Sequence, residues 1–341
     1  MSYPLDLTVS GLLSDHIGNT PVSRMYFQIG GLWRSMWLKL ESANPAGSLK
    51  DRTAVYLIAD LENRGLLKRG STIVESTSGN LGVALAFLCR EKGYRFLAVI
   101  DPKTTPENCS RMERLGAALE LVRDPDPTGG YLLSRLKRIH EICSNSPMFV
   151  WTNQYANPAN PEAHYHSTAP EIYRQFGGRI DAMFVAVSTG GTLAGIGRYF
   201  REVSPHTKII AVDAAGSVIF GTNPGPRKLT GIGSSRKSDF ITPDLYDAHV
   251  LVNDQQAFCT CRQLADAGIQ IGGSSGATVF ACARYLAQHP EIEHAVCLCP
   301  DGGENYRSTI FDDGWMRENG LDPNPEIALI HNIRLEQEPL F

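Results

Sequence analysis

Apolar and polar positions along the chain follow two alternating periodicities. Short runs rich in β-branched and aromatic residues predict strands at 36–40, 72–75, 96–100, 119–122, 148–151, 182–187, 208–212, 249–252 and 295–298. Between these runs, apolar residues recur three and four positions apart, which predicts helices at 52–64, 81–92, 106–115, 130–143, 192–203 and 255–267. Regular alternation of strands and helices is typical of βαβ units, so the expected fold class is α/β.

Two of the predicted strands are apolar throughout. The runs FLAVI (96–100) and AMFVAV (182–187) offer no polar residue that could face water. Crossover helices cover both faces of a parallel sheet, and such continuous runs are therefore expected in parallel strands. We expect layered domains with mostly parallel, twisted sheets.

Two stretches interrupt this pattern. The Asn/Pro-rich residues 153–161 lack both strand and helix signals and predict a seam between two series of βα units. Residues 221–243 are polar, rich in Gly and Pro, and without clear periodicity. Loops of this length in compact domains are usually functional or mobile.

Composition narrows the class of protein. The 341 residues suffice for two domains, and 32 Lys and Arg against 36 Asp and Glu give a net charge of −4, without a basic excess for nucleic acid. No run approaches the roughly 18 apolar residues of a membrane span, and the N-terminal residues show no signal-peptide pattern. We expect a soluble, cytoplasmic protein that binds neither nucleic acid nor membrane.

Cysteine and histidine usage does not indicate a metal site. Eight cysteines are far fewer than a disulfide scaffold contains, so we interpret them as reduced thiols. The two C-x-C pairs, 259/261 and 297/299, lack a second cluster that would complete a zinc site. His164 and His166 have no third ligand at suitable spacing, and we interpret them as an ordinary pair at a helix start.

Turns rich in Gly, Ser and Thr stand at four junctions to predicted helices, at 44–52, 76–82, 188–192 and 272–276. In open α/β sheets, ligands bind at such strand ends, where helix N-termini offer unpaired amides and partial positive charge. The turn STGGT (188–192) combines two adjacent glycines with three hydroxyls, which favours a phosphate group, although glycine turns also serve packing alone. Together the four turns predict one anionic ligand.

Lys50 lies just inside a predicted helix start, after a turn of small residues. Positive charge at a helix N-terminus lowers the pKa of an amine, and a lysine of lowered pKa can form an imine with a carbonyl compound. An isolated lysine is otherwise a solvated surface residue.

A rival hypothesis is a serine hydrolase. The segment 272–276 fits G-x-S-x-G between an apolar run, IQI, and a helix, with Ser274 as nucleophile and Asp301 and His331 as partners. This hypothesis leaves Lys50 and the other glycine turns without a role.

The ordered motifs NPAGSLKDR, ESTSGNLG, NQYANPANP, VAVSTGGTLAG, GIG and GGSSGATV resemble the fold type II, pyridoxal-phosphate-dependent family of cysteine synthase and cystathionine β-synthase. The segments VIDPK, HYH, VDAAGSVIFG and GIGSSR are most similar to N-(2-amino-2-carboxyethyl)-L-glutamate synthases of siderophore and 2,3-diaminopropionate biosynthesis. The resemblance implies two three-layer α/β domains, with 44–157 as a small mobile domain and 1–43 with 158–341 as a large one. It also implies a homodimer.

The resemblance also assigns residues. Lys50 would carry pyridoxal 5'-phosphate as an imine, and Asn80 and Ser274 would face the ring hydroxyl and the pyridine nitrogen. The cofactor phosphate would be bound by Ser188, Thr189, Gly190, Gly191 and Thr192. The substrate carboxylate would be bound by the loop Thr77, Ser78, Asn80 and Leu81, with Gln154. Apart from the resemblance, Arg236 is a candidate for binding a phosphate or carboxylate, because a guanidinium matches either anion, and Tyr155 is a candidate for the acceptor pocket. The alternative for Tyr155 is a packing role, and the alternative for Arg236 is a solvated position on the surface.

The reaction implied by the resemblance is β-replacement on O-phospho-L-serine through an aminoacrylate, with L-glutamate as the amine nucleophile. Lys50 would remove the α-proton. The alternative is a cysteine or cysteate synthase that uses sulfide or sulfite with O-acetyl- or O-phospho-L-serine. A descendant without activity that serves as an interaction module is disfavoured, because Lys50, Asn80 and Ser274 are all present.

Overall fold

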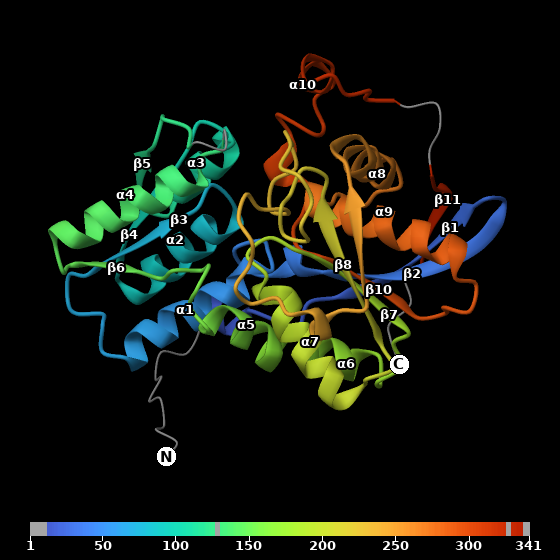
Figure 1. The fold of residues 1–341 in the computed structure, drawn as a ribbon, viewed down its shortest axis with the longest axis horizontal. Helices are drawn as coiled ribbons and strands as arrows, with labels where there is room; N and C mark the ends of the chain where they lie inside the picture. The colour runs from blue at the N-terminus through green and yellow to red at the C-terminus, as the bar shows by residue number, and fades with distance from the viewer. Residues whose placement is uncertain (1–11, 127–129, 325–328, 337–341) are drawn as a thin grey trace.

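The strands form two sheets in the computed structural model, which describes residues 12–126, 130–324 and 329–336 (Figure 1). The smaller sheet is parallel, with strands in the order β5-β4-β3-β6. Its strands are β3 (Thr72–Ser76), β4 (Arg95–Ile100), β5 (Ala118–Leu121) and β6 (Phe149–Trp151). Its helices are α1 (Lys50–Asn63), α2 (Asn80–Lys92), α3 (Pro106–Arg114) and α4 (Leu132–Asn145).

Helices cover both faces of this smaller sheet. Ile73 of β3 packs into a core that includes residues of α1, α2 and α3. The next residue, Val74, faces the opposite side and packs against Ile139 and Ile142 of α4. The result is three layers, as expected for strands that are apolar on both faces.

The larger sheet has the strand order β11-β1-β2-β10-β7-β8-β9, antiparallel at β11, β1 and β2 and parallel from β2 onward. Its strands are β1 (Val22–Ile29), β2 (Leu32–Leu40), β7 (Ala182–Ala186), β8 (Lys208–Ala214), β9 (Ala248–Val252), β10 (Ala295–Cys299) and β11 (His331–Glu336). The helices around it are α5 (Ala159–Ala163), α6 (Ala169–Gln175), α7 (Gly191–Val203), α8 (Asp254–Asp266), α9 (Gly273–Gln288) and α10 (Asp313–Glu318).

Short helical turns complete the chain: η1 (Leu13–His16), η2 (Glu41–Ala43), the π-helical turn η3 (His164–Thr168), η4 (Pro243–Leu245) and η5 (Glu304–Tyr306). In the larger sheet, Phe184 of β7 packs in the core formed with α8 and α9, and its neighbour Met183 packs in the core formed with α6 and α7. The predicted three-layer α/β class is therefore confirmed.

The predicted strands and helices are all present, with shifted ends. Strands β1 and β11, which form the antiparallel part of the larger sheet with β2, are not predicted by the sequence pattern. The seam predicted at 153–161 is wrong at its end, because α5 begins at Ala159 inside it. Within the described chain, 221–242 contain neither helix nor strand, as predicted.

The two sheets lie side by side in Figure 1, with α1 to α4 around one sheet and α6 to α9 around the other. The proposed division into 44–157 and the remainder follows this separation of sheets, although residues 1–11 of the proposed large domain lie outside the described chain. Among the described residues, no helix has the length and apolar character required to cross a membrane.

Candidate active site

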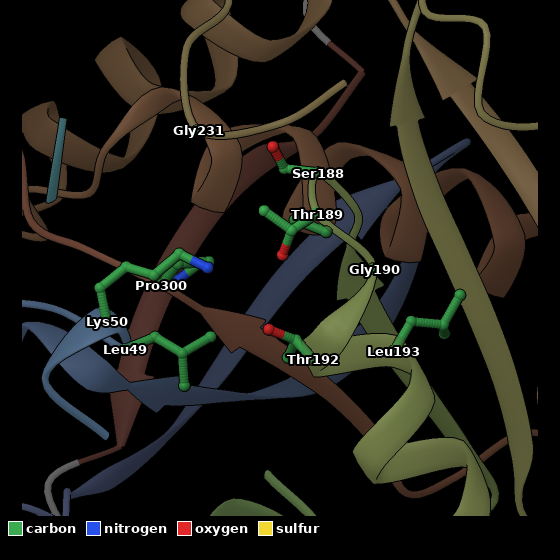
Figure 2. A pocket seen from close by; sticks show the side chains of 10 residues that line it. Leu49, Lys50, Ser188, Thr189, Gly190, Thr192, Leu193, Gly231 and Pro300 are labelled. Carbon is green, nitrogen blue, oxygen red and sulfur yellow. The ribbon is translucent and has the colours of Figure 1, made fainter. Parts of the chain in front are cut away.

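A cavity at the carboxyl end of β7 brings together segments that are far apart in the sequence. It is lined by the start of α1, the turn between β7 and α7, the long loop before η4 and the residue after β10: Leu49, Lys50, Ala186, Ser188, Thr189, Gly190, Thr192, Leu193, Gly231 and Pro300. Figure 2 shows the Lys50 side chain extending across this cavity toward Thr189. The position agrees with the rule that ligands bind beyond the carboxyl ends of parallel strands.

The turn from β7 into α7 requires both of its glycines. Gly190 caps α7 with a φ of +92°, and a Cβ atom there would lie 2.1 Å from Oγ of Ser238. A Cβ atom on Gly191 would lie 2.2 Å from Oδ1 of Asn160. The first turn of α7 leaves backbone amides without intrahelical partners, and the amides and the hydroxyl of Thr192 suit an anion such as a phosphate.

Lys50 is the first residue of α1 and lines the cavity. The preceding residue is held in place, because the amide of Leu49 donates to the carbonyl of Pro300 at 2.8 Å. Desolvation lowers the pKa of Lys50 to about 8. At pH 7, roughly a tenth of such amines are neutral and able to act as a nucleophile or a base.

A buried ion network fixes the start of α1 from behind. Nε of Arg52 lies 2.7 Å from Glu41, and Nη1 lies 2.9 Å from Glu171. Lys39 of β2 also pairs with Glu171. Breaking one of these buried ion pairs would leave an uncompensated charge in the interior. The network therefore favours one position of α1 and hence of Lys50. No local signal in the sequence marks these residues as a network, although Arg52 belongs to the NPAGSLKDR motif.

His164 was interpreted as an ordinary residue at a helix start, and the structure gives it a more specific position. It is fully buried, and its Nε2 lies 3.2 Å from Oγ1 of Thr192 and 3.1 Å from Oγ1 of Thr53. Its Nδ1 lies 3.0 Å from Oγ1 of Thr168. Burial, then the charges of Lys50 and Arg52, hold the pKa of His164 well below its usual value. A neutral imidazole therefore connects the helix of Lys50 with the glycine turn.

Asn80 and Ser274, which lie on different halves of the molecule, both contact Asp301. Nδ2 of Asn80, at the start of α2, donates to Oδ2 of Asp301 at 2.7 Å. Oγ of Ser274, in the first turn of α9, lies 3.5 Å from Oδ1 of the same carboxyl group. A Cβ atom on Gly231, which lines the cavity, would lie 3.8 Å from Oγ of Ser274. The two predicted cofactor residues are thus brought together, and Ser274 lies near the cavity wall.

The predicted substrate loop lies between β3 and α2. Oγ1 of Thr77 accepts a hydrogen bond from the amide of Gly82 at 2.9 Å, and the carbonyl of Ser78 lies 3.4 Å from Nδ2 of Asn108. The side chain of Leu81 is buried in the core of the smaller half, so this residue can offer a ligand only its backbone.

Gln154 lies beside this loop. Its Nε2 donates to the backbone carbonyl of Ser76 at 2.9 Å, and its backbone carbonyl accepts a hydrogen bond from Nδ2 of Asn160 at 2.8 Å. Asn160 in turn donates to Oγ1 of Thr189 at 3.0 Å. The substrate loop and the glycine turn are therefore connected through two amide side chains.

Tyr155 and Arg236, which were both predicted to bind substrate, lie near each other. The guanidinium carbon of Arg236 lies 5.7 Å from the centre of the Tyr155 ring. Desolvation raises the pKa of Tyr155, while the charges of Arg135, Arg236 and Arg227 act in the opposite direction.

Arg135 of α4 had no part in the sequence analysis, and it adds a buried cation to this end of the site. Its Nε lies 3.3 Å from Oδ2 of Asp101 in an ion pair, but both Nε and Nη1 are buried without a hydrogen-bond partner. An unpartnered buried donor is costly and indicates a site for an acceptor.

The loop that carries Arg236 is fastened to the glycine turn. Oγ of Ser238 donates to the carbonyl of Thr189 at 2.6 Å. Arg236 itself pairs with Asp239 at 2.8 Å and remains partly exposed.

The hydrolase hypothesis is wrong on geometry. The apolar run before Gly272 is no strand, since only Ile271 forms an isolated bridge, to Gly302. His331 is exposed at the start of β11, where it pairs with Gln28 at the edge of the larger sheet. Ser274 contacts Asp301 directly instead, so the serine, histidine and aspartate are not arranged as a triad. Among the described residues, no group of His, Cys, Asp and Glu could hold a metal ion.

Comparison with known families agrees with this geometry. The sequence matches the family of pyridoxal-phosphate dependent enzymes over residues 13–301. The chain belongs to this family, and its cofactor is pyridoxal 5'-phosphate.

Two relatives are both named N-(2-amino-2-carboxyethyl)-L-glutamate synthase. The relative from Ralstonia nicotianae is 44% identical over 303 residues, which cover 89% of this chain and 90% of that protein. The relative from Cupriavidus metallidurans is 40% identical over 313 residues, with coverages of 90% and 92%.

A solved structure, the O-acetylserine dependent cystathionine β-synthase from Helicobacter pylori, matches with a TM-score of 0.80 and 30% identity, covering 89% of this chain and 99% of that one. The chain is a pyridoxal-phosphate-dependent synthase of the β-replacement type.

The residues present fit this cofactor. A lysine of lowered pKa lines the cavity and could bind an aldehyde, and the glycine turn at the start of α7 offers backbone amides and hydroxyls to a phosphate. Polar side chains of Asn80 and Ser274 are available for the ring.

Proposed function

We propose that this enzyme makes N-(2-amino-2-carboxyethyl)-L-glutamate from O-phospho-L-serine and L-glutamate. The observation that carries the proposal is that the two relatives of this name are 44% and 40% identical over about nine tenths of the chain. The solved cystathionine β-synthase has lower identity, 30%, and so gives weaker support to a sulfur nucleophile.

Lys50, Asn80, Ser274 and the turn at 188–192 are the proposed cofactor residues. The bound cofactor supplies an electron sink that stabilises negative charge at the substrate α-carbon. The amine of Lys50, with a pKa of about 8, would then hold and move the α-proton at Nζ. The neutral His164 and the buried pairs of Arg52 keep this amine and the hydroxyl of Thr192 in place.

The substrate carboxylate is assigned to the loop between β3 and α2. Thr77, Ser78, Asn80 and the backbone of Leu81 lie at the N-terminus of α2, where unpaired amides favour an anion. Gln154 faces the same loop through its bond to Ser76. We further propose that residues 44–157 move as a unit when substrate binds, and that the enzyme is a homodimer.

The outer end of the site is assigned to the second anion. The positive charges of Arg236 and Arg135, which lie on different segments, both oppose the rise in the pKa of Tyr155. Arg135 also has buried nitrogens without a hydrogen-bond partner. A phosphate ester and glutamate each bring an anionic group that guanidinium binds well. O-acetylserine and sulfide bring much less charge to this end, so the basic residues favour the phosphoserine and glutamate pair.

The test is a substrate matrix with purified enzyme. O-phospho-L-serine and O-acetyl-L-serine are each combined with L-glutamate, sulfide or sulfite, and products are measured by mass spectrometry together with released phosphate. We expect turnover with O-phospho-L-serine and glutamate to exceed every other pair by at least tenfold. Faster formation of cysteine or cysteate would replace the proposal by the sulfur alternative.

Light scattering at working concentration tests the homodimer. A monomeric mass would contradict that part of the proposal without affecting the substrate assignment.

A further inference from the structure

One buried carboxyl group connects the proposed cofactor residues of the two halves. Asp301 follows β10 and is only 1% exposed. Its Oδ2 accepts hydrogen bonds from Nδ2 of Asn80 at 2.7 Å and from the hydroxyl of Tyr306 at 2.5 Å. Its Oδ1 lies 3.5 Å from Oγ of Ser274.

The backbone around Asp301 is tied to the same parts of the site. The carbonyl of Pro300 accepts from Leu49, the residue before Lys50. The carbonyl of Asp301 accepts from Oγ of Ser275 at 3.1 Å. Asp301 also forms an isolated bridge with Ser48. The carboxyl group therefore has little freedom to move away from its partners.

The contacts of Asn80 define which way its amide points. A carboxylate can only accept hydrogen bonds, so the nitrogen of Asn80 must face Asp301. Oδ1 of Asn80 accepts from Nδ2 of Asn305 at 3.2 Å, which agrees with this orientation. One hydrogen of Nδ2 then remains free for an acceptor in the site.

The same reasoning applies to Ser274. If its hydroxyl donates to the carboxylate of Asp301, its oxygen keeps only lone pairs for other neighbours. An oxygen presented in this way would favour a protonated ring nitrogen.

We propose that Asp301 is a positioning residue that orients the amide of Asn80 and the hydroxyl of Ser274 toward the ring of the cofactor. The inference rests on the proposed roles of Asn80 and Ser274. Beyond those roles, it requires that the carboxylate of Asp301 sets the direction of the hydrogen bonds made by both Asn80 and Ser274.

The surroundings of the carboxyl group contain several titratable groups. Tyr306 and Glu304 face it from the segment after β10, together with Cys261 of α8 and Cys299 of β10. Burial raises the pKa of Asp301 to about 6, and the hydrogen bonds from Tyr306, Asn80 and Ser274 oppose this change. At neutral pH the carboxylate form, which can only accept, predominates.

The experiment replaces Asp301 by its isosteric amide in the holoenzyme. Asp301→Asn is compared with the wild type in two measurements, the dissociation constant for pyridoxal phosphate and the absorption maximum of the bound cofactor from pH 6 to pH 9. We expect affinity to fall about tenfold and the absorption maximum or its pH profile to shift, because an amide can donate as well as accept.

The matched control is Ser275→Ala, which removes a hydrogen bond to the backbone of Asp301 and leaves the carboxyl contacts intact. Its melting temperature is expected to fall, with the cofactor spectrum and affinity close to those of the wild type. A purely structural role for Asp301 would instead give the two variants the same pattern.

Tyr306→Phe serves as a second variant in case Asp301→Asn does not fold. It removes one donor from the oxygen that also holds Asn80, and it should shift the spectrum in the same direction by a smaller amount. Wild-type affinity and spectrum in Asp301→Asn, or in Tyr306→Phe when only that variant folds, would overturn the inference. The proposed function fails separately, if the wild type does not attach the cofactor to Lys50 or prefers sulfide.

Discussion

The inner end of the site is built from helix starts, whereas the outer end is built from a loop and a helix flank. At the inner end, Lys50 begins α1, Asn80 begins α2, Gly191 begins α7 and Ser274 lies in the first turn of α9. At the outer end, Arg236 belongs to a long loop without regular structure and pairs with an exposed carboxylate.

This difference between the two ends suggests a division of tasks, with the cofactor chemistry at the inner end and the choice of acceptor at the outer end. Residues at helix starts are held by backbone geometry and buried hydrogen bonds, so the cofactor chemistry tolerates little change. Loop residues on a rigid scaffold can vary without disturbing that scaffold. The inner end should therefore be shared by related enzymes with different acceptors, and the outer end should decide which acceptor is used.

The strongest test of the inner end is Lys50→Ala. Loss of the amine should reduce turnover by at least about a thousandfold, because no other group can replace both the covalent attachment and the base. The variant should also lose the visible absorption band of the covalently bound cofactor. Lys68→Ala, at an exposed lysine, is the control and should retain both. A Lys50→Ala variant with substantial turnover would refute the assignment.

Gly191→Ala tests the space around the proposed phosphate site. The new methyl group would collide with Asn160, and overpacking of this kind costs roughly 1–3 kcal/mol. We expect affinity for pyridoxal phosphate, measured by equilibrium dialysis, to fall about ten- to a hundredfold.

The control for this substitution is Gly314→Ala in the exposed first turn of α10, where the added methyl meets only the end of the Asp312 side chain. Its affinity should match that of the wild type. Equal affinities in all three proteins would show that the turn does not bind the cofactor.

Arg236→Ala tests the outer end. The variant should raise the KM for O-phospho-L-serine or glutamate by about tenfold, the typical value of one charge-assisted contact, with little change in the cofactor spectrum. Arg201→Ala removes a surface arginine paired with Asp247 and is the matched control. Unchanged kinetics would return Arg236 to the role of a solvated residue, and a changed cofactor spectrum would contradict the separation of the two ends.

The smallest expected effect concerns pH. Under the proposed role of Lys50, attachment of the cofactor to apoprotein requires its neutral amine, whose pKa is lowered to about 8, so the rate should rise with pH. We expect an increase of about fivefold from pH 7 to pH 8 and a plateau above about pH 9. Nα-acetyl-lysine, with an ordinary amine pKa, should show rates that still rise at pH 9. A protein rate that follows this reference would indicate a solvated lysine.

The parts of the fold that could be predicted from the sequence are those whose own residues carry a clear local pattern. The run AMFVAV is buried throughout β7 except at Ala186, as its continuous apolar character predicts. By contrast, β1 alternates, with Tyr26 and Gln28 between buried residues, and its stability depends on pairing with β2 and β11. Such pairing is a tertiary property that a local pattern does not contain.

The same limit applies to the site. The glycine turns and Lys50 carry local signals, since glycine at a helix start and lysine after small residues are unusual in themselves. His164, Arg135 and Asp301 each contact a partner far away in the sequence: Thr192 for His164, Asp101 for Arg135 and Asn80 for Asp301. Their positions become meaningful only once the chain is folded.

The hydrogen bond from Ser238 to Thr189 has a consequence for protein engineering. Any exchange of the 221–243 segment between enzymes with different acceptors would also replace the Ser238 hydroxyl, which binds this segment to the turn proposed to hold the cofactor. A chimera that keeps a serine at this point should preserve cofactor retention while its acceptor preference changes. One that loses it would combine both effects, and altered selectivity could then be mistaken for a damaged catalyst.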